Sequence, residues 1–153
     1  DKWLEKYAAL AEKKCTKINA NQAGTGAAGG LGFAFLSFTN AVLESGIKIV
    51  LEETSLEKYM ENADIVITGE GRLDGQTAMG KAPVGVAKLG RKYGAKTIAF
   101  AGSVTKEAVA CNEAGIDAFF PIVRGISTLE EAMDPDTAKA NMAAAAEQVF
   151  RLL

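Results

Sequence analysis

Hydrophobic positions along the chain follow two patterns, one typical of helices and one typical of buried strands. From residue 64 onward, three short apolar runs, at residues 65–67, 98–100 and 118–120, alternate with longer segments of helical spacing. Continuous apolar runs of this length are typical of strands buried on both faces. The order strand, helix, strand, helix, strand, helix predicts an α/β fold with helices on both faces of a doubly wound, mostly parallel sheet.

The helices between and after these strands have sequence signals at their ends. Pro83 suits the first turn of a helix, and Gly94 is placed to end that helix. A second helix should end at Gly115, and Asp134 with Pro135 should begin the last one. Two pairs of residues have the spacing of a capping box. They are Thr54 with Glu57 and Ser127 with Glu130.

The first part of the chain is less regular. An apolar stripe near the start predicts a core-facing helix. It holds Trp3, Leu4, Tyr7, Ala8 and Ala11. After a glycine-rich run at residues 24–32, a second helix has a broad apolar face, which predicts burial on more than one side. That face includes Leu31, Phe35, Phe38 and Val42. Alternating apolar positions predict a short strand next. They are Ile47, Ile49 and Leu51.

Composition and charge narrow the class of protein. The chain has 153 residues, 48% of them hydrophobic and 24% charged, which is the balance of an ordinary globular domain. A net charge of -2 argues against nucleic acid or a membrane surface as partner. We find no apolar run long enough to span a bilayer and no signal peptide, and therefore expect a cytoplasmic protein.

The residue types present also limit the chemistry. The two cysteines, Cys15 and Cys111, lack metal-type spacing and are expected to be reduced, buried thiols. Histidine is absent, which excludes Ser-His and Cys-His nucleophile systems and most zinc sites. Acid–base chemistry must therefore fall to Asp, Glu, Lys or Tyr.

A polar, glycine-rich loop is expected at residues 69–80, directly after the first buried strand. Ligands of doubly wound sheets bind beyond the carboxyl ends of the strands, which points to the segments after Thr68, Ala101 and Ile122. In the first of these, Arg72 could grip a carboxylate or phosphate, and Asp74 could hold magnesium or accept a hydroxyl proton. Lys81 precedes a helix N-terminus, where anions are favoured. An ordinary solvated loop is the competing interpretation.

The earlier glycine run carries a weaker signal. Gly24, Gly26 and Gly29 match the dinucleotide fingerprint G-x-G-x-x-G, but polar residues precede them where a buried strand is required. A phosphate-binding Walker loop is excluded because Gly30 stands where lysine is needed. The run could cradle an anion or form a tight packing turn. After the second strand, Ser103 could add a backbone amide to the main site.

These segments resemble the two-domain bacterial glycerate kinases. The resemblance rests on residues 69–72, 74, 76–77 and 80–87, with support from residues 24–32 and 101–103. Two departures are Ala23, where the family usually has proline, and Thr25, where it usually has a small residue. Family members are also much longer, and they open with a strand that has no counterpart here. A chain that begins with Asp1 is therefore expected to be a fragment.

The resemblance implies a partial domain with a three-layer α/β/α, Rossmann-like sheet. Residues 1–53 would be the end of an inserted domain, and residues 54–153 the C-terminal part of the Rossmann-like domain. The expected partners are the missing N-terminal part of the same enzyme and, through an exposed sheet edge, a second copy in a homo-oligomer.

The resemblance also implies transfer of the γ-phosphate of ATP, with Mg²⁺, to a hydroxyl of D-glycerate. Asp74 would hold Mg²⁺ or take the hydroxyl proton, Arg72 and Lys81 would bind phosphate or carboxylate, and Glu70 would orient these groups. Further substrate- or phosphate-binding positions would be Gly69, Gly71, Gln76, Thr77, Gly24, Gly26, Gly29, Gly30 and Ser103. The competing functions are a nicotinamide-dependent oxidoreductase and a non-catalytic nucleotide- or anion-binding module.

Overall fold

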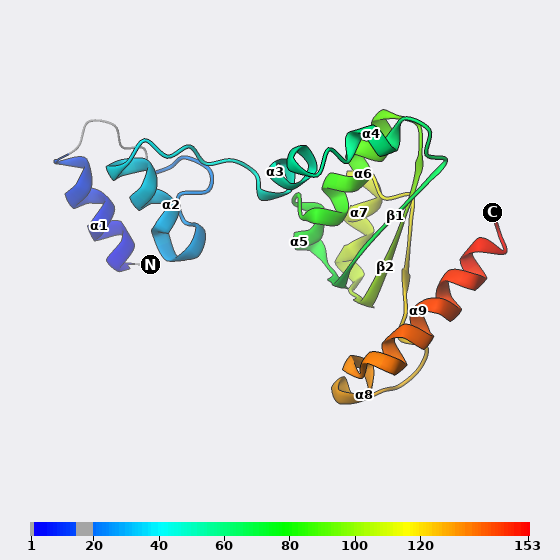
Figure 1. The fold of residues 1–153 in the computed structure, drawn as a ribbon. Helices are drawn as coiled ribbons and strands as arrows, with labels where there is room; N and C mark the ends of the chain where they lie inside the picture. Colours follow the sequence, from blue (N-terminus) through cyan, green and yellow to red (C-terminus); the bar gives the residue numbers. More distant parts are fainter. Residues whose placement is uncertain (1, 15–19) are drawn as a thin grey trace. The chain divides into compact units, whose positions relative to one another are not determined.

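The computed structural model describes residues 2–14 and 20–153, so the expectation for Cys15 lies outside the described residues. The described chain forms two compact units, Asp1–Ser45 and Gly46–Leu153 (Figure 1). The division falls before the boundary expected at residue 53, because the helix that follows Ser45 packs on the second unit. That the first unit ends an inserted domain stays a prediction.

The described residues of the first unit form two helices that pack together. They are α1 (Lys2–Glu12) and α2 (Ala27–Phe38). The ring of Tyr7 meets the ring of Phe33 edge-on, with 5.4 Å between their centroids. Ala11 is buried, as predicted for the α1 stripe, but Trp3 is 82% exposed. The stripe therefore faces the core only along part of its length.

Helix α2 is far less buried than its apolar sequence predicts. Of its residues only Gly30, Gly32 and Phe33 are buried. The residues of the broad apolar face are 48–83% exposed, so the prediction of burial on several sides is wrong for this structure. The exposed positions are Leu31, Phe35 and Phe38, with Val42 beyond the helix end. The physical reason is that α1, which packs on α2, covers the Phe33 side.

The second unit begins with two short helices, α3 (Gly46–Glu53) and α4 (Glu57–Met60). The strand predicted here is wrong. Ile47 and Leu51 are half-buried while the residues between them are exposed, which is the i, i+4 pattern of a helix. The predicted Thr54–Glu57 capping box is also absent, because the Thr54 hydroxyl donates to the Val50 carbonyl at 2.7 Å and so belongs to the end of α3.

The sheet is parallel, as predicted, with strand order β1-β2-β3. The strands are β1 (Ile65–Leu73), β2 (Lys96–Val104) and β3 (Ala118–Pro121). The first two extend further than predicted, so residues 69–72 and 102–103 lie in strands and not in loops. At Gly69 a Cβ would come within 2.2 Å of the Phe100 carbonyl oxygen, so glycine here permits close strand pairing.

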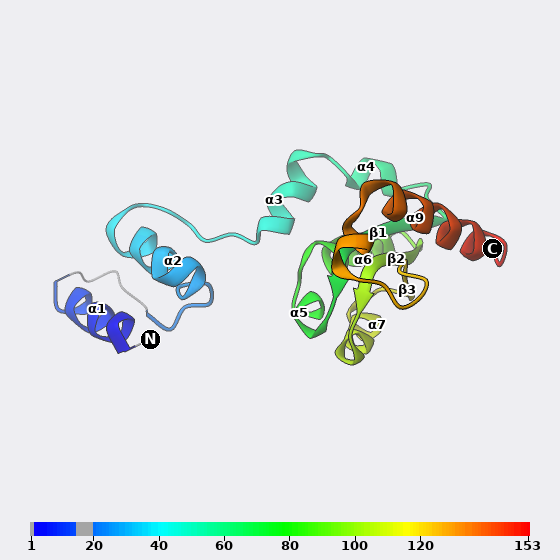
Figure 2. The same ribbon diagram turned by 90° about the horizontal axis from the view of Figure 1, so that it is seen from below.

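Helices cover both faces of this sheet, which confirms the three-layer fold (Figures 1 and 2). On β2, Ala99 and Ala101 join a core cluster with α6 (Ala82–Lys92) and α7 (Ala110–Ala114). Ile98 and Phe100 instead pack with Val149 of α9 (Pro135–Phe150). Successive β2 side chains therefore supply the two cores in turn.

Most of the predicted helix ends are confirmed. Pro83 lies in the first turn of α6, and Gly94 follows its end with φ +79°. Gly115 ends α7, which a 3₁₀ turn, η1 (Lys106–Val109), precedes. Asp134 caps α9. The capping box of α8 (Leu129–Met133) uses Thr128 and Glu131, one residue later than predicted.

Candidate active site

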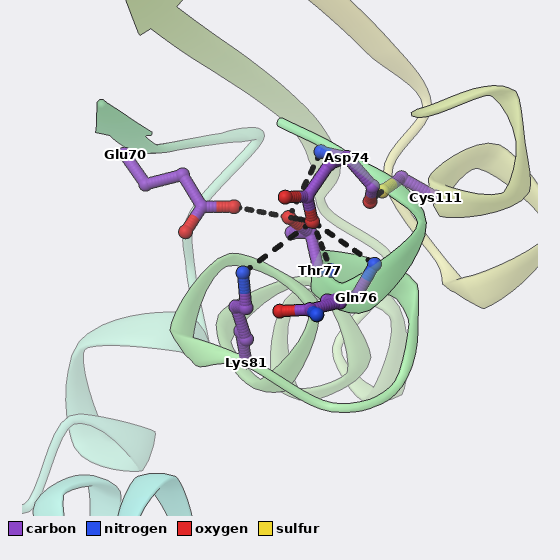
Figure 3. Close-up of polar contacts among 6 residues, drawn as sticks. All are labelled: Glu70, Asp74, Gln76, Thr77, Lys81 and Cys111. Carbon is purple, nitrogen blue, oxygen red and sulfur yellow. Dashed lines mark hydrogen bonds and ion pairs between the residues drawn. The ribbon is translucent and has the colours of Figure 1, made fainter. Parts of the chain in front are cut away.

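The candidate site lies where β1 ends and the short helix α5 (Gly75–Ala78) begins (Figure 3). Asp74 is the N-cap of α5, and its Oδ1 accepts the backbone N–H groups of Gln76 at 2.9 Å and Thr77 at 3.1 Å. In return, the Thr77 hydroxyl accepts the Asp74 N–H at 3.2 Å. The segment predicted as one long loop is therefore a strand end closed by a capping box.

Thr77 also links this turn to the strand. Its side chain is fully buried, and its hydroxyl donates a hydrogen bond to Oε1 of Glu70 on β1. Figure 3 shows the Glu70 carboxylate reaching toward Thr77 and Asp74 from the strand. Glu70, Asp74 and Thr77, all predicted as site residues, are thus brought together.

Lys81 completes the cluster from the other side. It is the N-cap residue of α6, and its Nζ lies 3.4 Å from Asp74 Oδ1. Partial burial by itself would raise the pKa of Asp74, but the hydrogen bond from the Thr77 N–H, the Lys81 ammonium and the Gln76 N–H outweigh it. The pKa of Asp74 is therefore lowered, and the carboxylate is charged at neutral pH.

Two further predicted residues lie opposite each other near the carboxyl ends of β1 and β2. Arg72 and Ser103 are register partners on β1 and β2, and both are exposed. Gln76 is exposed on α5. The Arg72 guanidinium and the Lys81 ammonium are thus carried by β1 and by the start of α6, on either side of Asp74 in sequence. Gly71 has open space around its Cβ position, so its backbone is accessible from that side.

Glu107 is an acidic residue near this site that the sequence interpretation missed. It lies on η1, and a Cβ at Gly75 would come within 3.3 Å of the Glu107 Cβ. Its pKa is lowered, first by the Thr105 hydroxyl, then by its own N–H, and also by the charge of Arg72. Thr105 Oγ1 has no hydrogen-bond partner among the described residues. We therefore attribute its effect on the pKa of Glu107 to the electrostatic influence of the hydroxyl and not to a formed hydrogen bond. The available signal was the polar Thr-x-Glu sequence just after β2.

Cys111 supports the turn from behind. It is buried, as predicted, and its Sγ lies 3.8 Å from the Asp74 carbonyl oxygen, to which the thiol donates. Burial raises the pKa of Cys111, and the negative charges of Glu70 and Asp74 raise it further. The thiol is therefore neutral at physiological pH, which argues against a role as nucleophile.

The glycine run of the first unit has a different character. Gly24 has φ +90°, and a Cβ at Gly32 would lie 2.4 Å from the Gly24 carbonyl oxygen. A Cβ at Gly30 would meet Leu4 at 2.8 Å. These contacts favour the tight packing turn over the anion cradle. Gly26 and Gly29 have open space around them, and their binding role stays a prediction, as does that of Gly24 and Gly30.

Two cavities lie away from the candidate site. One of about 240 Å³ in the first unit is lined by Leu4, Tyr7 and Phe33 among others, an apolar lining that does not suit phosphate. The other, of about 590 Å³, is lined by Asp64 and Lys96 at the amino ends of β1 and β2. Parallel sheets bind ligands at the carboxyl ends of their strands, so we assign the site to the Asp74 turn.

The described residues contain no group of three or more Cys, Asp and Glu side chains that could hold a metal ion by themselves. Magnesium usually takes only one or two protein carboxylates together with substrate phosphates, so Asp74 alone still fits that ion. Within the same residues, no helix combines the length and the apolar character needed to cross a membrane.

Comparison with known proteins supports the resemblance seen in the sequence. Residues 1–153 match the family model described as "Glycerate kinase family". A glycerate kinase of Bacillus subtilis is 44% identical over 134 residues, which are 88% of this chain and 35% of that protein. One from Haemophilus influenzae is 39% identical over 153 residues, 100% of this chain and 40% of that protein.

A solved structure gives the same result. The crystal structure described as glycerate kinase 2 from Salmonella typhimurium LT2 matches with a TM-score of 0.61 and 37% identity, over 97% of this chain and 39% of that one. This chain spans well under half the length of these relatives. The match over the full chain and the identity to several curated members show that the chain belongs to the glycerate kinase family.

Proposed function

We propose that the intact protein, meaning the polypeptide of family length that contains this chain, is an ATP-dependent glycerate kinase. The observation that carries the proposal is the network of Glu70, Asp74, Thr77 and Lys81 at the carboxyl end of β1, in a chain of this family. The substrate is D-glycerate, the phosphoryl donor is ATP, and the products are phosphoglycerate and ADP.

Phosphoryl transfer requires positioned groups more than covalent chemistry. The oxygen of a glycerate hydroxyl forms a bond to the γ-phosphorus of ATP, and the bond from that phosphorus to the β,γ-bridging oxygen breaks. The hydroxyl proton must leave, and ionised Asp74 is proposed either to accept it or to bind the metal. Its lowered pKa favours metal binding, because it makes the carboxylate a weaker base. Mg²⁺, when bound, supplies neutralisation of the phosphate charge, and Asp74 is the residue proposed to hold it.

The cations of the site are suited to the charges of both substrates. Lys81 has a side chain that is 41% exposed and caps α6, whose N-terminus favours anions. Arg72 is exposed on β1 and can present two parallel N–H groups to a carboxylate or phosphate. We assign these two residues to the phosphates of ATP and to the carboxylate of glycerate, and Glu70 to orienting the turn.

The competing functions have weaker support. A nicotinamide cofactor would require the Gly24 run to follow a buried strand, whereas its described neighbours at residues 20–26 form turns and bends. Three of its glycines, Gly24, Gly30 and Gly32, have close neighbours within the first unit. A non-catalytic anion-binding module stays a candidate for the 153-residue chain taken by itself. Thermal shift with NAD, ATP and glycerate separates these alternatives.

The decisive assay measures ADP release by the intact protein with magnesium, ATP and either glycerate or glycerol. Glycerol lacks the carboxylate that Arg72 and Lys81 would bind, so we expect turnover with glycerate only. Equal turnover of the two alcohols would contradict the carboxylate assignment, and no ADP release with glycerate would contradict the function. The Bacillus subtilis relative serves as a positive control.

The 153-residue chain assayed by itself is expected to be essentially inactive. Holding two substrates in reacting geometry can supply about 7–11 kcal/mol of barrier reduction. The chain spans well under half the length of its relatives, so we expect it to hold that geometry poorly even if the Asp74 turn forms. Turnover near that of the intact protein would show that this chain holds the complete site.

A further inference from the structure

The Thr77 hydroxyl has one proton and several polar neighbours. It donates to Glu70 Oε1, accepts the Asp74 N–H at 3.2 Å, and lies 3.3 Å from Asp74 Oδ1. A hydroxyl can donate to one acceptor at a time, and the Glu70 oxygen is the nearer of the two carboxylate oxygens. Since the side chain is also fully buried, this hydroxyl has no proton left for a phosphate or a substrate hydroxyl.

The same residue holds both carboxylates of the site. Its hydroxyl holds the Glu70 carboxylate from β1, while its backbone N–H donates to Asp74 Oδ1 at 3.1 Å. The Asp74 backbone is bound in turn by the Thr77 hydroxyl. One residue therefore fixes where the strand end and both carboxylates lie with respect to one another: its buried hydroxyl holds Glu70 and the Asp74 backbone, and its backbone N–H holds the Asp74 carboxylate (Figure 3).

We propose that Thr77 is a positioning residue that sets the geometry of Glu70 and Asp74, and that it does not contact substrate. This inference rests on the proposed kinase function and offers an alternative to the expectation that Thr77 binds substrate or phosphate. Threonine suits the role because its branched Cβ restricts the side-chain rotamer. Reacting groups tolerate only displacements well below 1 Å. Loosening the hydrogen bonds that Thr77 makes to Glu70 and Asp74 should therefore reduce the rate without removing any substrate contact.

The kinetic test compares two substitutions of the intact protein. Thr77→Val keeps the shape but removes the hydroxyl, and we expect kcat to fall about 10–100-fold while KM for ATP and glycerate changes less than about twofold. Thr77→Ser keeps the hydroxyl and should retain most of kcat. A rise in KM with kcat retained would show direct substrate contact and overturn the inference, as would an unchanged kcat in the valine variant.

A second measurement tests the bridge without any substitution. In the unsubstituted intact protein, NMR should detect a slowly exchanging Thr77 hydroxyl proton with a nuclear Overhauser effect to the Asp74 amide proton. Rapid exchange of both protons would overturn the bridge even if the valine variant failed to fold. Loss of glycerate phosphorylation by the unsubstituted intact protein would instead contradict the proposed function, so the two failures are distinguishable.

Discussion

The two glycine-rich segments of this chain look alike in sequence and differ in physical role. Residues 24–32 lie in a stretch, from 20 to 43, without any charged side chain, and several of their glycines avoid clashes with Leu4 or with the neighbouring backbone. Residues 69–81 carry Glu70, Arg72, Asp74 and Lys81, and they run from a buried strand into a capped turn. Glycine content by itself therefore does not mark a ligand site. Position at the carboxyl end of a parallel strand, together with hydrogen-bonded polar side chains, is the stronger indicator of a ligand site.

The largest expected effect of a single glycine substitution lies in the second segment. Gly69→Ala would place a Cβ 2.2 Å from the Phe100 carbonyl oxygen, between paired strands. We expect a loss of about 3 kcal/mol in the free energy of unfolding of the second unit, the upper end for overpacking. Gly71→Ala is the matched control, since its Cβ meets no atom within 4 Å. Hydrogen exchange of the β2 amides measures both, and equal protection in the two variants would contradict the strand assignment.

A smaller effect is expected in the first segment. Gly32→Ala would place a Cβ 2.4 Å from the Gly24 carbonyl oxygen, and the loop can yield more readily than a sheet. We expect a loss of about 1–2 kcal/mol, read from exchange of the Phe33 amide, which donates to the Thr25 carbonyl at 3.0 Å. Gly26→Ala, which has open space, should change it by less than about 0.5 kcal/mol. The packing interpretation fails if the Gly26 variant is the more damaging one.

The smallest expected difference between the two segments is in how the exchange protection of their amides depends on pH. The pKa of Asp74 is lowered in the folded chain, so the stability from its cap is present above the unfolded value of about 3.9 and is lost as pH falls through the folded value. Exchange protection of the Gln76 and Thr77 amides should therefore persist at pH 4 and fall only below it. The Phe33 amide in the uncharged segment has no such local cause. Asp74→Asn should abolish the transition, and a midpoint above 4 would contradict the cap.

Much of the fold follows from sequence, and the failures have physical causes. The three parallel strands and the ends at Pro83, Gly94 and Gly115 were predicted, because buried runs and backbone-restricting residues act locally. Ile47 and Leu51 satisfy both a strand and a helix period, and packing on α6 decides between them. The strand at 69–72 was missed because glycine usually ends a strand, whereas here it allows one to pair closely.

The sequence predicted where the candidate site lies, but it did not predict the hydrogen bonds and contacts among the residues of the site. Asp74, Glu70 and Lys81 lie together as the loop position indicates. That Thr77 is buried beneath them, and that Glu107 approaches from η1, depends on contacts between separate elements. The exposure of α2 could likewise not be predicted from the spacing of its apolar residues, because that spacing shows an apolar face and not what covers it.

If Asp74 acts at the reacting centre of a glycerate kinase, as proposed, its substitution should lower the turnover rate without unfolding the protein. Asp74→Asn in the intact protein should lower kcat with glycerate about tenfold or more, since a base or metal ligand typically contributes at least that much. The control Asp136→Asn changes an exposed carboxylate in the first turn of α9 and should leave kcat unchanged. Circular dichroism and exchange of the β2 amides show whether each variant is folded. A folded Asp74→Asn variant with the kcat of the unsubstituted protein would show that Asp74 is not at the reacting centre.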